Sequence, residues 1–272
     1  MKKPMIPVLT ALMLISLTLA SCGKKEVPKF YLAETVTTIH AAGQVNRTVN
    51  EFDEDWNVIA AVNYTNGQET SRTLYEITEE VTRITMVQNG VSELQGVTVT
   101  DKSGHTTHSE VYLSGEVSNT VDNTYDADGH LLTSERWIAD QNLTSRSEYT
   151  NNEAGKKVRE DVYSGGGLDH YTVYTYDEAG RVLTDTTCQS DGTETSWQKY
   201  TYEEAVDGTL IQKAYQCDAS GTQQSLRAVC VYDKYENLLS QEIYMGGDTP
   251  FMTLAMRYVT GDGTVSSGIT EE

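Results

Sequence analysis

Residues 174–183 read YTYDEAGRVL, and related stretches recur along the chain. Asp177 can fix a turn because its side chain accepts hydrogen bonds from amides that follow it. Gly180 can take the positive φ that a tight return needs, and Val182 and Leu183 then begin a second strand. The stretch therefore predicts a β-hairpin.

The same offsets return at residues 52–59, 125–132 and 232–239, with weaker copies at 100–105, 152–156 and 202–210. Their spacing of roughly 25 residues lies in the range of repeat proteins. Between them lies a second series of turn signals, Asn66-Gly67, Asn89-Gly90, Ser114-Gly115, Gly165-Gly166, Asp191-Gly192, Ser220-Gly221 and Gly246-Gly247. We expect an all-β fold: an elongated, coiled antiparallel meander of about 16 to 19 strands in a single-layer or partly curled sheet.

Adjacent apolar residues follow three of the turns, at Leu131-Leu132, Val182-Leu183 and Leu238-Leu239. Neighbouring residues of a strand point to opposite faces, so both faces should carry some apolar surface, with the concave face better buried. The strands lack one consistently apolar side, which argues against a barrel that faces lipid.

The first residues of the chain predict a secretion signal. Lys2 and Lys3 precede an apolar run that ends in Leu19-Ala20-Ser21-Cys22. These last residues resemble the lipobox of bacterial lipoproteins, which implies a Cys22 lipidated with fatty acids such as palmitate. We expect a signal peptide at 1–21, a lipidated tether at 22–29 and a repeat domain at 30–272. The protein should be anchored outside the cytoplasm, to the cell membrane or the outer membrane.

Charge and missing motifs exclude several functions. The formal charge is −20, and it becomes −22 without residues 1–21, which carry Lys2 and Lys3 and no acid. So acidic a chain is a poor partner for nucleic acid. Hydrolase, zinc, phosphate-binding and dinucleotide motifs are absent, so we expect no cofactor and no catalysis.

The segments NTYDADGHLL, YTYDEAGRVL and CVYDKYENLL resemble the YD repeats of the rearrangement-hotspot (RHS) family. The similarity is strongest from Tyr125 to Leu239. In that family the repeats form a spiralling β-sheet that builds shells or surface structures. The resemblance implies a repeat architecture more directly than an activity.

Acidic residues gather at one series of turns and should form a row along one sheet edge. Asp126, Asp128 and Asp177 are the candidate calcium ligands of that row. The alternative is that each Asp organises only its own turn, since no complete calcium loop is present. His105 and His108 should point to opposite faces and share no metal, and Cys188, Cys217 and Cys230 should be small buried thiols without a disulfide.

Four tyrosines, Tyr171, Tyr174, Tyr200 and Tyr202, are candidate stacking platforms for a ligand. The alternative is that they are cross-strand pairs that hold the sheet. We expect a non-enzymatic binding or structural module whose partner, besides the membrane, is a glycan or an envelope protein. The alternative function is a carbohydrate-active enzyme that uses paired carboxylates on the concave face.

Overall fold

The computed structural model describes residues 28–218 and 222–270. The expected signal peptide, Cys22 and nearly all of the tether lie outside these residues. Apart from a single 3-10 turn, η1 (His40–Ala42), the regular elements of the described chain are 19 antiparallel strands. None of its helices is long and apolar enough to cross a bilayer.

The strands follow one another along the chain. The first ten are β1 (Phe30–Ile39), β2 (Gln44–Phe52), β3 (Val58–Thr65), β4 (Gln68–Ile77), β5 (Val81–Gln88), β6 (Val91–Thr100), β7 (Thr106–Leu113), β8 (Glu116–Tyr125), β9 (Leu131–Ile138) and β10 (Leu143–Asn151). The others are β11 (Lys157–Ser164), β12 (Gly167–Tyr176), β13 (Val182–Gln189), β14 (Glu194–Glu204), β15 (Leu210–Cys217), β16 (Gln223–Tyr232), β17 (Leu238–Ile243), β18 (Met252–Thr260) and β19 (Val265–Ser267).

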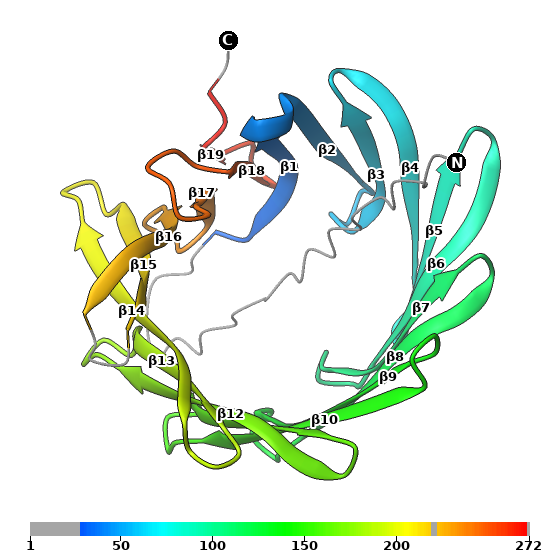
Figure 1. Ribbon diagram of the computed structural model, residues 1–272. Coiled ribbons are helices and arrows are strands. Elements are labelled where there is room, and N and C mark those ends of the chain that lie inside the picture. The colour runs from blue at the N-terminus through cyan, green and yellow to red at the C-terminus, as the bar shows by residue number, and fades with distance from the viewer. Residues whose placement is uncertain (1–27, 219–221, 271–272) are drawn as a thin grey trace, which may run out of the picture.

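The sheet closes on itself. β1 pairs with β2 on one side and with β18 on the other, from Phe30↔Thr260 to Ile39↔Met252. Strands β1 to β18 thus form an antiparallel barrel, seen end-on in Figure 1, and β19 pairs only with the end of β18. The all-β meander of repeated hairpins is confirmed, but the expected elongated, partly curled sheet is wrong, because the strands close into a barrel.

A regular set of bulges supplies the curvature. Tyr176 pairs with Val182 and Thr175 pairs with Thr184, which leaves Leu183 as an extra residue. Leu132 and Leu239 are extra residues at the same point of their hairpins. The adjacent apolar pairs therefore mark bulges and are not simple alternation between two faces. Each bulge bends its strand and increases the twist. The repeated bulges therefore curve the meander until its first and last long strands, β1 and β18, can pair.

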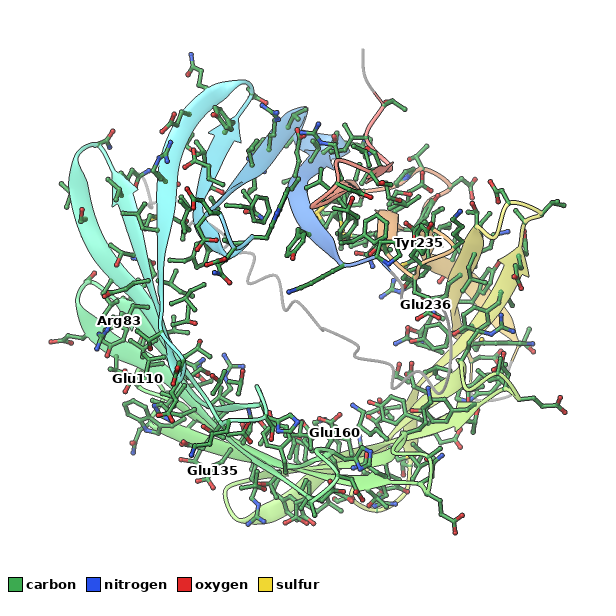
Figure 2. The ribbon with its side chains drawn as sticks, turned by 180° about the vertical axis from the view of Figure 1, so that it is seen from behind. Arg83, Glu110, Glu135, Glu160, Tyr235 and Glu236 are labelled. Carbon is green, nitrogen blue, oxygen red and sulfur yellow. The ribbon has the colours of Figure 1, made fainter. Side chains whose placement is uncertain are left out.

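The strand pairing separates an outer wall from an inner wall, since direct cross-strand partners share a face. Asp122, Glu135 and Arg146 are successive partners on the outer wall, and Tyr149, Glu160 and Thr172 are successive partners on the inner wall. Figure 2 shows Glu135 on the outside of the ring and Glu160 facing the enclosed space, which we call the lumen.

Burial is modest throughout, as expected for a thin sheet. The buried apolar residues are small or lie near the closure, among them Ala60, Ala61, Val62, Leu254 and Met256, and no large side chain of the described residues is fully buried. A barrel of this many strands is too wide for its own side chains to fill.

The two ends of the barrel carry different turns. One end holds the loops after the even-numbered strands β2 to β18, many of them built on an Asp; we call it the capped rim. The other end holds the loops after the odd-numbered strands β1 to β17; we call it the hairpin rim.

Candidate functional site

In many turns of the capped rim, the side chain of an Asp accepts hydrogen bonds from the residue four positions later. One oxygen of Asp177 accepts the Arg181 backbone N–H at 2.8 Å, and the other accepts Arg181 Nε at 2.7 Å. The same pair of bonds joins Asp53 to Asn57, Asp101 to His105, Asp126 to His130 and Asp233 to Asn237. His, Arg and Asn thus have the same structural role at this position of the repeat.

These bonds also set the acidity of the turn carboxyls. The backbone N–H of Arg181 lowers the pKa of Asp177, and the N–H of His130 does the same for Asp126, because both bonds favour the charged carboxylate. Both carboxyls stay partly exposed, with 33% of the Asp126 side chain and 18% of the Asp177 side chain accessible.

The calcium candidates are only partly brought together. Asp126 and Asp128 lie with His130 in a group whose ligand atoms are all within 4.8 Å, whereas Asp177 belongs to another turn. Both carboxylate oxygens of Asp126 already accept bonds from its own turn. The carboxylates do line one rim, but the arrangement supports turn organisation over metal binding.

Neighbouring turns pack on each other through the residue after the glycine. A Cβ placed on Gly129 would lie 2.7 Å from His105 Nε2, and one on Gly155 would lie 2.0 Å from His130 Nε2. Lys156 reaches Gly180 in the same way, at 3.1 Å. The sequence analysis did not predict these contacts. The repeat nevertheless contains the signal, since each of these glycines is matched by a long side chain in the preceding turn of the same rim.

The four candidate tyrosines do not form one platform. Tyr171 lies on the outer wall beneath Arg159, whose guanidinium carbon is 3.9 Å from the ring centroid. Tyr174, Tyr200 and Tyr202 lie on the inner wall. The sequence could have predicted this separation. Tyr171 and Tyr174 are three residues apart, and residues of a strand at that spacing point to opposite faces.

Several tyrosines of the inner wall form a hydrogen bond between their own strand and the preceding strand. Tyr125, Tyr176 and Tyr202 each donate from the phenol to a backbone carbonyl at the start of the previous strand, at 2.7, 2.5 and 2.8 Å. Their hydroxyls are therefore satisfied by the sheet. This supports the cross-strand alternative for Tyr202.

A polar cluster of the lumen lies on β11 to β14. Lys157 Nζ donates to Glu160 at 2.8 Å and sits 4.5 Å from the ring centroid of Tyr174. Tyr174 pairs across the strands with Asp185, which accepts the Tyr200 hydroxyl at 2.6 Å. Asp185 is buried, and this burial raises its pKa. Two carboxylates thus flank one tyrosine on the inner wall.

The remaining candidates have structural surroundings. His105 stacks on Tyr125, with 4.7 Å between ring centroids, whereas His108 bonds Asp122 at 2.7 Å on the outer wall. Cys188, Cys217 and Cys230 are buried free thiols. Two surface depressions lie elsewhere: one of about 600 Å³ beside Arg146 and Tyr163, and one of about 420 Å³ beside Met245 and Phe251.

The fold defines the class as a closed antiparallel β-barrel built from hairpin repeats. Searches of family models and of curated proteins found no match to the chain. Among solved structures it is similar to a porin-like protein from Bacteroides uniformis, with 10% identity over 83% of this chain and 95% of that one and a TM-score of 0.46. Two more distant similarities are to TcdB2-TccC3-TEV, with 9% identity over 74% of this chain and 18% of that one at a TM-score of 0.24, and to a GH43_1 enzyme from Xanthomonas citri, with 8% identity over 89% and 92% at 0.18.

Proposed function

We propose that the protein is a lipid-anchored, non-enzymatic β-barrel that stands outside the cytoplasm on the cell membrane or the outer membrane and binds an envelope component. The observation that carries this proposal is the charged outer wall. Arg47, Arg72, Arg83, Glu110, Asp122, Glu135, Arg146, Glu148, Arg159 and Asp161 lie along it.

Such a wall is a poor match for the interior of a bilayer. An arginine or lysine facing lipid at mid-depth costs about 2 to 4 kcal/mol. Ion pairs on this wall, such as Arg159 with Asp161 at 2.6 Å, are the arrangement expected in water. Attachment to the membrane then falls to the lipobox cysteine, Cys22.

The anchor is tested by expression of the full chain and of Cys22→Ala in a bacterium. The full chain should incorporate a labelled palmitate analogue and remain with washed membranes. Cys22→Ala should do neither. Equal membrane retention of both proteins would overturn the anchor.

The binding role draws on the lumen, where half-buried tyrosine rings and amide or hydroxyl groups offer stacking and hydrogen bonds to a glycan or an envelope protein. A glycan array and affinity capture from native membranes would identify the partner. A barrel that retains no glycan and no envelope protein would leave only the structural role.

A second function is favoured by Asp185 and Glu160, which flank Tyr174 on the inner wall. A buried carboxyl with a raised pKa close to a second carboxyl is the arrangement that glycoside hydrolysis uses. This alternative predicts glycan cleavage that is lost in both Asp185→Asn and Glu160→Gln. Cleavage unchanged in these variants, or none in the unsubstituted protein, would rule it out.

A further inference from the structure

The capped rim carries an aromatic cluster at the point where the chain enters the barrel. Tyr31 stacks on Trp56 with 5.0 Å between ring centroids, and Phe52 lies 5.5 Å from Trp56. On the other side, Phe30 lies 5.0 Å from Tyr235. We call these five residues the seam cluster, because they flank the β1–β18 junction; Figure 2 marks Tyr235 on this part of the ring.

Two lysines accompany these rings. Lys29 Nζ lies 5.1 Å from the Tyr31 centroid, and Lys234 Nζ lies 5.0 Å from the Tyr235 centroid. Both lysines are exposed. Aromatic rings with a polar edge and lysines with a long apolar stem are the side chains that favour the boundary between lipid and water.

Two turns in this part of the rim place a residue other than glycine at the positive-φ position where turns such as that of Gly180 have a glycine. Trp56 has φ 63° and donates its N–H to the Asp53 carbonyl, which is the position that Gly180 holds in its own turn. Glu236, next to Tyr235, also replaces a glycine there, with φ 67°. A bulky residue in this conformation is strained and persists where another role requires it.

The length of the tether fits the same rim. Phe30 begins β1 at the capped rim, where it pairs with Thr260. The seven residues 23–29 span at most about 25 Å. A ten-residue strand such as β4 covers about 34 Å along its own axis. A lipid on Cys22 would therefore hold the capped rim, where β1 begins, nearer to the membrane than the hairpin rim.

We infer that the seam cluster rests in the headgroup layer of a zwitterionic phospholipid membrane, so that the capped rim faces the bilayer and the hairpin rim faces outward. This inference rests on the lipid anchor proposed above. The exposed acids beside Trp56, Asp53, Glu54 and Asp55, disfavour an anionic headgroup layer.

The native tryptophans provide the test, because Trp56 lies on the capped rim, whereas Trp137 lies one residue from the hairpin-rim end of β9. The lipidated chain is placed in phosphatidylcholine vesicles brominated near the headgroups. The variant Trp137→Phe/Trp197→Phe, which keeps Trp56, should lose tryptophan fluorescence emission in these vesicles. The matched variant Trp56→Phe/Trp197→Phe, which keeps Trp137, should not.

Flotation of the vesicles separates the two ways in which the inference can fail. Lipidated protein that does not float with the vesicles overturns the anchor. Protein that floats but keeps its full Trp56 emission, or loses Trp137 emission instead, overturns the rim contact alone. The unsubstituted chain, with its three tryptophans, needs no substitution and should show a partial loss.

Discussion

Glu34 binds Arg257 across the junction that closes the barrel. The two residues are direct partners in the β1–β18 pairing, and a second arginine, Arg47 on β2, reaches the other oxygen of the same carboxylate. The Glu34 side chain is only 7% exposed. One buried carboxylate thus joins three strands, and it joins the two ends of the sheet to each other.

Replacement of Glu34 should therefore weaken the closure. We expect Glu34→Ala to lower the free energy of unfolding by about 2 to 4 kcal/mol, because two arginines lose the charge that they enclose. Chemical denaturation measures the loss. Glu51→Ala is the matched control, since the Glu51–Arg72 pair lies on the same wall but is 42% and 38% exposed, and it should cost less than about 1 kcal/mol. Equal losses in the two variants would contradict a special role for the closing pair.

The glycine of the repeat gives a second prediction. Gly180 has φ 77°, and a Cβ there would lie 3.1 Å from Lys156 Cε. Gly180→Val should destabilise the barrel by roughly 1 to 3 kcal/mol. Gly165→Val should cost less, because Gly165 has φ 60° and no neighbour within 4 Å of the added carbon. Hydrogen exchange should lose protection mainly between Tyr171 and Tyr202; no loss in Gly180→Val would refute the turn assignment.

Acid should unfold the barrel through its capped turns. Because hydrogen bonds lower the pKa of Asp53, Asp101, Asp126 and Asp177 in the folded state, their stabilisation is present above the unfolded pKa and is lost as the pH falls through the folded one. Stability should thus decline below about pH 4.

A single substitution isolates this effect. Asn152 already makes the same backbone bonds in its own turn without a carboxyl. Asp177→Asn should therefore keep the turn and show a shallower fall of the midpoint of thermal unfolding between neutral and acidic pH. An unchanged slope would mean that Asp177 does not carry the acid sensitivity.

The cysteines give a fourth prediction. Burial raises the pKa of the Cys217 and Cys230 thiols, so neither should react readily in the folded protein. In Cys22→Ala, three thiols should titrate after denaturation without reductant. One thiol instead of three would show a disulfide and would contradict the strand register.

The sequence by itself determined the hairpin repeat. Asp177, Gly180 and Arg181 interact within four residues, so their spacing predicts the turn without any knowledge of the rest of the chain. The common role of His130, Arg181 and Asn237 followed from the same local geometry. The meander of strands followed because each hairpin brings only neighbouring segments together.

Only the tertiary structure decided that the sheet closes, and which residues share the lumen. Closure pairs Phe30 with Thr260 through the accumulated twist and bulges of every strand between them. Each bulge adds one residue and so reverses the alternation of side chains between the two faces. Alternation counted along the sequence therefore assigns residues to the wrong face beyond each bulge, as at Leu183. The pairing of Tyr174 with Asp185 and the burial of Glu34 depend on that long-range register, which no short stretch of sequence encodes.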